Sequence, residues 1–227
     1  VAVAGLFVWA TWRRLGESEN PLFDVALLVW AALGLTGALV VALIVQDDGK
    51  QSAGWIALAV HGIGLFALAR WTPRFQYVAA LAPLLSLLAL ALWRDTADFG
   101  ALAAAFGGLY GAAAFALLWN AARPGFWAAL SVAAALSHFL LSWYVLRGVT
   151  DAPWGLISIG LAVPFLVGAE RLARWRESMA GATEALGLLA AGVAFFVAAA
   201  IALALRREWI TVAYAVECAA VAVIARW

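Results

Sequence analysis

The feature that most constrains the fold is the final stretch of the chain, Arg206–Trp227, in which an apolar run lies between two boundaries of arginine and tryptophan. A helix from Trp209 to Trp227 would be about 27 Å long at 1.5 Å per residue, close to the thickness of a bilayer's hydrocarbon core. This stretch therefore predicts a transmembrane helix over 210–225. The same plan recurs back through the chain, which indicates a multi-pass membrane protein.

Composition agrees with this interpretation, because only 12% of residues are charged and 67% are hydrophobic, whereas soluble domains have about 25% charged residues. We predict an all-α fold, a polytopic transmembrane helical bundle in which 1–227 form a single transmembrane region. About nine spans are expected, at 1–12, 22–45, 53–69, 75–93, 99–119, 125–146, 154–169, 182–205 and 210–225. The first is too short to cross a bilayer, so we expect the chain to be a fragment of a longer membrane protein.

Polar connections separate the spans, the longest being Glu170–Gly181. Four arginines that follow alternate spans are separated by 53, 51 and 52 residues: Arg70, Arg123, Arg174 and Arg226. Three of them lie in the tripeptide Ala-Arg-Trp. This spacing predicts stacked helical hairpins of one repeating size. Uniform helices with arginine-rich turns on one side would also produce such a spacing, so both interpretations stand.

The distribution of arginine and lysine predicts the orientation, since cytoplasmic turns are rich in these residues. Nine of the 14 basic residues fall on one side, which includes the turns at Arg70, Arg123 and Arg174 and is predicted to be cytoplasmic. All but one of the basic residues are arginine and alanine is frequent, which we interpret as the codon bias of a bacterial genome. The expected location is a bacterial inner membrane.

The expected partners follow from this location. They are the lipid bilayer and further spans of the same longer chain. No basic run is long enough to suggest nucleic acid. Tryptophans at span ends, including Trp119 and Trp175, are interpreted as interfacial anchors.

Ionisable residues inside predicted spans are the candidates for function. A carboxylate near the bilayer centre costs roughly 3 kcal/mol, so Glu217 requires a reason. Tyr214 lies on the same face of its helix as Glu217. His138 shares a helix face with Trp127, Ser131 and Ser142, and His61 is flanked by Gly62 and Gly64, which would let another helix come near it.

These residues predict an intramembrane polar site, because histidine titrates near neutrality and intramembrane ionisable groups often mark proton or substrate paths. Its candidate members are Glu217, His138, His61, Tyr214, Ser131 and Ser142. Alternatively, Glu217 is protonated or paired with a neighbouring helix and only locks helix packing. Pro83 and Pro164 are expected to kink their helices, as in the broken helices of transporters, although prolines are common in membrane spans.

Small residues at four-residue spacing in the span 99–119 predict a close helix contact. They are Ala103, Gly107 and Gly111.

No zinc-binding, nucleophile-elbow, P-loop or dinucleotide pattern occurs, so no catalytic residue, metal or cofactor is expected. Two functions remain, a transporter or proton-relay protein with a midspan polar site, and a structural membrane scaffold for cell-envelope assembly.

The run from Arg206 to Ala220 resembles a segment of a large bacterial family of predicted many-span membrane proteins of unknown function. The local likeness covers about twenty residues, and Cys218 departs from the small residue expected there. The resemblance implies that this chain is an internal piece of a longer protein. It carries over no activity.

Overall fold

The computed structural model describes residues 21–47, 52–93, 96–175 and 180–204, together with Ala215 and Cys218. Seven segments in these ranges are helices long and apolar enough to cross a membrane. The described part of the chain is therefore an all-α, multi-pass membrane protein with seven candidate spans and not nine. The remaining predicted spans, 1–12 and 210–225, lie outside the described residues apart from Ala215 and Cys218.

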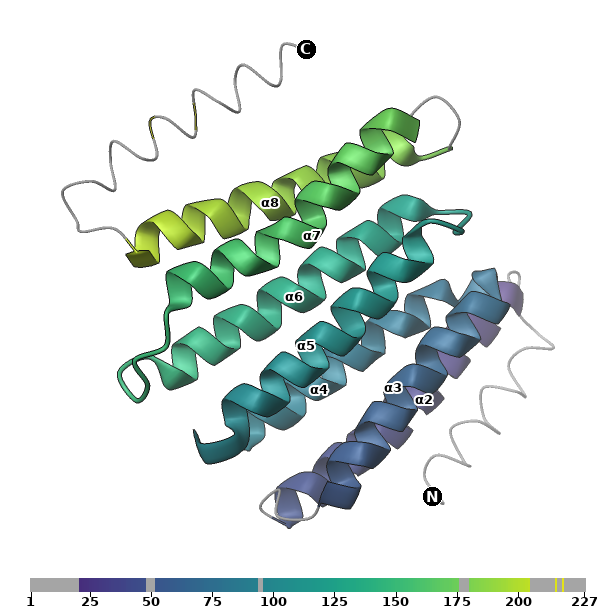
Figure 1. Ribbon diagram of the computed structural model, residues 1–227. Coiled ribbons are helices and arrows are strands. Elements are labelled where there is room, and N and C mark those ends of the chain that lie inside the picture. The colour runs from purple at the N-terminus through teal and green to yellow at the C-terminus, as the bar shows by residue number, and fades with distance from the viewer. Residues whose placement is uncertain are drawn as a thin grey trace. The chain divides into compact units, whose positions relative to one another are not determined.

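The helices follow one another through short connections (Figure 1). Their bounds are Pro21–Gln46 (α2), Ser52–Trp71 (α3), Pro73–Ala80 (the 3₁₀ helix η1), Leu81–Leu92 (α4), Thr96–Leu118 (α5), Pro124–Leu146 (α6), Trp154–Trp175 (α7) and Ala182–Ala204 (α8). Each predicted span from 22–45 to 182–205 corresponds to one of these segments, with η1 and α4 together forming the fourth.

The predicted boundary between the seventh span and its following connection is wrong. The connection was expected to begin at Glu170, but α7 continues to Trp175. Side chains four residues apart support the extra turn, because Glu170 forms an ion pair with Arg174 and the Arg171 guanidinium lies 4.7 Å from the ring centre of Trp175. Such pairs stabilise a helix although its residues are polar.

The two prolines within predicted spans act differently. Pro83 lies in the first turn of α4, where no helical N–H is required. The residues before it form the 3₁₀ helix η1, so the span changes helix type at Leu81. Pro164 lies inside α7, which stays one helix across it. Because Pro164 has no N–H, the carbonyl of Gly160 loses its usual helical donor.

The chain divides into two compact units, residues 1–113 and 114–227, and the boundary falls within α5. In the first unit, α2, α3 and α4 contact one another pairwise. In the second unit, α6, α7 and α8 do the same. The single transmembrane region over 1–227 stays a prediction.

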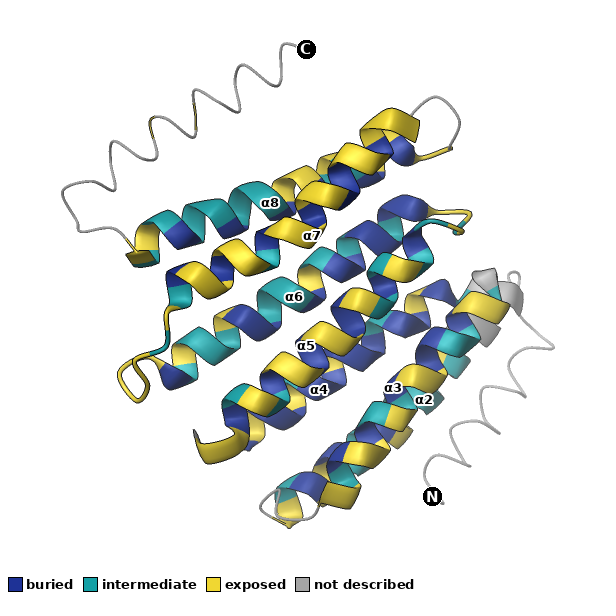
Figure 2. Ribbon diagram, in the orientation of Figure 1, coloured by how far each residue is buried: buried dark blue, intermediate teal, exposed yellow. Residues whose placement is uncertain are grey.

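Every described span presents a buried face and an exposed face, which alternate along the ribbons in Figure 2. The exposed faces are apolar; on α7 they carry Leu156, Ile157, Ile159, Val163, Leu166 and Val167. Apolar faces of this extent on helices of spanning length are stable against hydrocarbon and not against water. The seven spans therefore imply contact with a lipid bilayer.

A buried hydrogen bond joins two helices of the second unit. The hydroxyl of Ser158 on α7 donates to the backbone oxygen of Phe196 on α8 over 2.7 Å, and Ser158 is fully buried. We expect Ser158→Ala to lower the free energy of unfolding by about 1 kcal/mol, since interhelical hydrogen bonds in membranes contribute about 0.6–1.7 kcal/mol. Unfolding of the purified full chain in mixed micelles by SDS titration measures this change.

The matched control for that measurement is Ser137→Ala. The Ser137 hydroxyl donates to Ala133 of its own helix over 2.6 Å, so its removal breaks no contact between helices. If both alanine variants unfold at the same SDS fraction as the wild type, the interhelical bond contributes nothing.

Candidate intramembrane polar site

His61 lies near the middle of α3, about 14 Å from either end at 1.5 Å per residue. Its ring approaches the backbone of α2, because a Cβ built at Gly37 would lie 3.1 Å from the His61 Nε2 atom. This Nε2 atom is buried and has no hydrogen-bond partner among the described residues. A titratable nitrogen is therefore enclosed within the first unit with its hydrogen-bonding capacity unused there.

The helix surface beside His61 is closely packed. A side chain at Gly62 would collide with the ring and hydroxyl of Tyr110 on α5. The Tyr110 hydroxyl donates to the backbone oxygen of Leu58 over 3.4 Å, and its ring stacks on Phe66 with centres 5.9 Å apart. In contrast, a Cβ built at Gly64 would have no neighbouring atom within 4 Å. Of the two glycines that flank His61, only Gly62 receives a neighbouring helix in the described structure.

His138 is buried in the second unit, with 2% of its surface exposed. Its Nδ1 atom lies 2.8 Å from the backbone oxygen of Ala134. A carbonyl oxygen only accepts, so Nδ1 carries the proton and Nε2 is the nitrogen that gains or loses one. The Ser142 hydroxyl donates to the backbone oxygen of His138 over 2.8 Å, and so serves the helix backbone instead of the ring.

Of the remaining members of the predicted site, one is buried and two lie outside the described residues. Ser131 is buried on α6, as is Trp127. Glu217 and Tyr214 lie outside the described residues. The two histidines belong to different units, so the meeting of Glu217, His138 and His61 at one site stays a prediction.

The three small residues of α5 that are predicted to form a close helix contact are buried, and they are Ala103, Gly107 and Gly111. A close contact between two helices requires such a row of small residues to be buried. The helix expected to pack against these residues is not identified by their burial alone, so their packing role stays a prediction.

Gln76 on η1 was not selected from the sequence. It is 4% exposed, and its Nε2 atom has no hydrogen-bond partner within the described ranges. A lone amide inside the predicted span 75–93 was the signal that could have identified it. Tyr110 offered a comparable signal, a hydroxyl inside the span 99–119.

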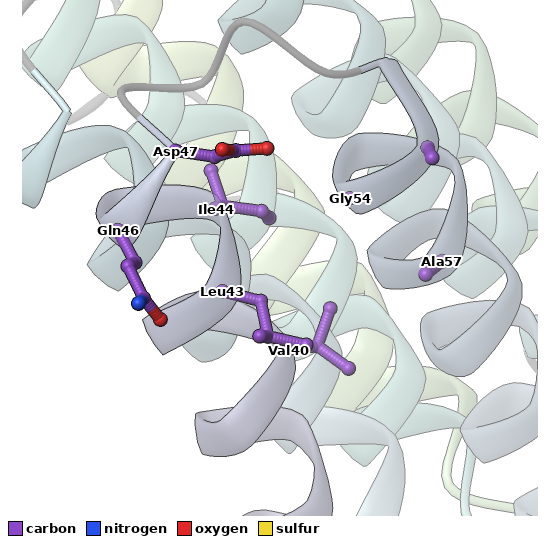
Figure 3. Close-up of a pocket in the computed structure, with 8 residues that line it drawn as sticks. Val40, Leu43, Ile44, Gln46, Asp47, Gly54 and Ala57 are labelled. Carbon is purple, nitrogen blue, oxygen red and sulfur yellow. The ribbon is translucent and has the colours of Figure 1, made fainter.

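A hollow of about 470 Å³ opens in the first unit between the last turns of α2 and the first turns of α3 (Figure 3). Its lining is mainly apolar, and its polar side chains are Gln46 and Asp47 at the end of α2. In Figure 3 the Asp47 carboxylate extends toward α3 while Gln46 points away. The hollow lies at the end of a span and contains none of the predicted site residues.

Within the described part of the chain, no group of three or more His, Cys, Asp or Glu side chains is arranged to hold a metal ion.

Comparison with known proteins found no matching protein-family model, curated protein or solved structure. The family suggested by the resemblance of Arg206–Ala220 is therefore not identified, and the class that stands is a many-span helical membrane protein.

Proposed function

We propose that this multi-pass membrane protein moves protons, or a solute coupled to protons, by way of titratable groups near the middle of its spans. The observation that carries the proposal is the enclosed Nε2 atom of His61, which has no hydrogen-bond partner among the described residues. Leaving a buried polar atom unpaired costs about 1–3 kcal/mol. Such a cost is explained when the group has a functional task.

Proton transfer is the task that fits a midspan histidine, because a ring nitrogen of imidazole can both accept and release a proton. His61 accepts a proton at Nε2 and releases it to the next group along the path. The Nε2 atom of His138 is the corresponding acceptor in the second unit, since Nδ1 is held by Ala134. Glu217 supplies an acid on the last predicted span, with Tyr214, Ser131 and Ser142 as accompanying polar groups. The proposed role is not enzymatic.

The cellular setting is proposed on the sequence pattern. The protein lies in a bacterial inner membrane with the turns at Arg70, Arg123 and Arg174 on the cytoplasmic side. The resemblance of Arg206–Ala220 to a family of many-span bacterial proteins supports this class. Two units, each with three helices that contact one another pairwise, support a repeated helical architecture.

A structural scaffold for envelope assembly is the second candidate, and close glycine packing favours it. Side chains built at several glycines would collide with a neighbouring helix, and these are Gly62, Gly155, Gly168 and Gly192. A rigid bundle of this kind transmits or resists force without moving any solute. In that case the two histidines and Glu217 only hold helices together.

Proton flux into liposomes reconstituted with the purified full chain tests the first proposal. We expect the wild type to dissipate an imposed pH gradient and His61→Gln to reduce the initial rate at least tenfold, because glutamine keeps a polar amide but cannot titrate. Ser137→Ala is the matched control, since its hydroxyl bonds only within its own helix, and its rate is expected to equal that of the wild type.

Two outcomes would contradict proton transfer through His61. Equal rates for His61→Gln and the wild type would show that protons cross without this residue. No flux above protein-free liposomes in the wild type would favour the scaffold, particularly if His61→Gln also unfolds at a lower SDS fraction.

A further inference from the structure

An arginine in the second unit is held between two tryptophans at the end of a span. The Arg171 guanidinium carbon lies 4.9 Å from the ring centre of Trp119 and 4.7 Å from that of Trp175. The two indole rings are nearly perpendicular, at 80°, with centres 6.2 Å apart. We name these three residues the arginine–tryptophan corner. Cation–π contacts of this kind hold the guanidinium plane while its N–H edges stay available.

The carboxylate next to Arg171 in the sequence is engaged elsewhere. Glu170 pairs with Arg174. Glu184, in the first turn of α8, lies against Gly125 at the start of α6, where a Cβ would collide with its carboxylate. No ion pair joins Arg171 to a carboxylate of the described residues. Within the part of the chain that the structure describes, its positive charge is therefore balanced by aromatic faces and not by a carboxylate.

The corner lies at the depth where lipid headgroups meet a spanning helix. Trp175 is the last residue of α7, and Trp119 directly follows the last residue of α5. Both helices are candidate membrane spans, and tryptophans at span ends lie at the level of the headgroups. Arg171 itself is exposed, so a headgroup can reach its N–H groups.

We propose that the arginine–tryptophan corner binds the phosphate of an anionic lipid headgroup. A guanidinium donates two parallel hydrogen bonds to phosphate oxygens, and basic residues at the membrane surface recognise anionic lipids in this way. The two indoles supply apolar surface for the glycerol backbone of the lipid beside the charge. The guanidinium supplies hydrogen-bond donors for the phosphate, and the indole rings supply apolar walls. This combination selects a lipid over soluble phosphate.

A second Ala-Arg-Trp tripeptide lacks the corner. Trp71 is the last residue of the same tripeptide in α3. The residue four positions before it is Ala67, whereas the residue four positions before Trp175 in α7 is Arg171. Trp71 is 82% exposed. The site therefore depends on the added arginine at the fourth position before the tryptophan. Arg70, which corresponds to Arg174 in the tripeptide, provides a control with the same charge near the end of another span.

Native mass spectrometry of the detergent-solubilised full chain, titrated with phosphatidylglycerol or phosphatidylcholine, tests the proposal. We expect tighter binding of phosphatidylglycerol, and Arg171→Gln is expected to weaken it about fivefold or more, as loss of one interfacial basic contact implies. Arg70→Gln is expected to change it less than twofold. Trp119→Leu is expected to weaken it as well, since it removes one wall while it keeps the charge.

The remaining outcomes overturn the proposal. Equal losses for Arg171→Gln and Arg70→Gln would show general attraction between arginines and anionic lipid. Unchanged binding in both Arg171→Gln and Trp119→Leu would exclude the corner as the site. Displacement of phosphatidylglycerol by equimolar inorganic phosphate would assign the site to a soluble anion. If Arg171→Gln does not fold, Arg171→Lys, which keeps the charge but loses the planar donor pair, takes its place with the same expected direction.

Discussion

Replacing Gly62 with leucine is expected to lower the free energy of unfolding by about 3 kcal/mol, at the upper end of the usual cost of overpacking. The reason is the contact with Tyr110, whose ring and hydroxyl occupy the space that a side chain at this position would need. Tyr110 is 1% exposed and cannot swing into open space. Its hydrogen bond to Leu58 would also be disturbed. SDS titration in mixed micelles measures the change.

Gly64→Leu is the matched control on the same helix. A Cβ at Gly64 meets no atom within 4 Å, and this residue is exposed. Its leucine would face lipid tails, so the free energy of unfolding is expected to change by less than about 0.5 kcal/mol. Equal losses in the two variants would mean that any side chain in this part of α3 is unfavourable, and that Tyr110 is not the cause.

Replacing Phe196 with alanine is expected to lower the free energy of unfolding by about 3 kcal/mol, within the usual range for a buried phenylalanine. Phe196 on α8 is fully buried where the three helices of the second unit meet. Its ring stacks on Phe165 of α7 at 5.8 Å and meets Phe139 of α6 edge to face at 5.7 Å. Removal of the ring therefore leaves a cavity that borders all three helices.

The lost energy would be packing energy and not hydrophobic transfer, because lipid tails are as apolar as the protein interior. Leu166→Ala on α7 tests this distinction, since Leu166 is 57% exposed and its side chain faces outward. We expect that variant to stay within about 0.5 kcal/mol of the wild type. Comparable losses for Phe196→Ala and Leu166→Ala in SDS titrations would indicate that the aromatic cluster adds no specific stability.

Most span positions could be predicted because the length of an apolar run is a local property. The predicted 125–146 and 182–205 differ from α6 and α8 by one residue at one end each. The end of α7 could not be predicted in this way. Its last turn carries charged residues among which side chains four residues apart pair, Glu170 with Arg174 and Arg171 with Trp175. The same turn buries Leu172 completely, and that burial depends on the tertiary packing.

The candidate site was predictable only as a set of residue types. A histidine inside an apolar run is visible in any sequence, and this pattern predicts both His61 and His138 as candidates. Their surroundings were not visible, since the backbone that His61 approaches at Gly37 belongs to another helix, α2. The structure also shows that Ser142 bonds to the backbone of His138 and not to its ring.

The sequence by itself determined that this chain is a many-span helical membrane protein, because a bilayer admits helices of that length and apolarity with their backbone groups paired internally. Only the tertiary structure decided which face of each helix is buried. Gly62 and Gly64 are chemically identical, yet at 100° per residue they point about 200° apart around α3. The packing of neighbouring helices sets the rotation of α3, and it places Gly62 against Tyr110 while Gly64 stays exposed.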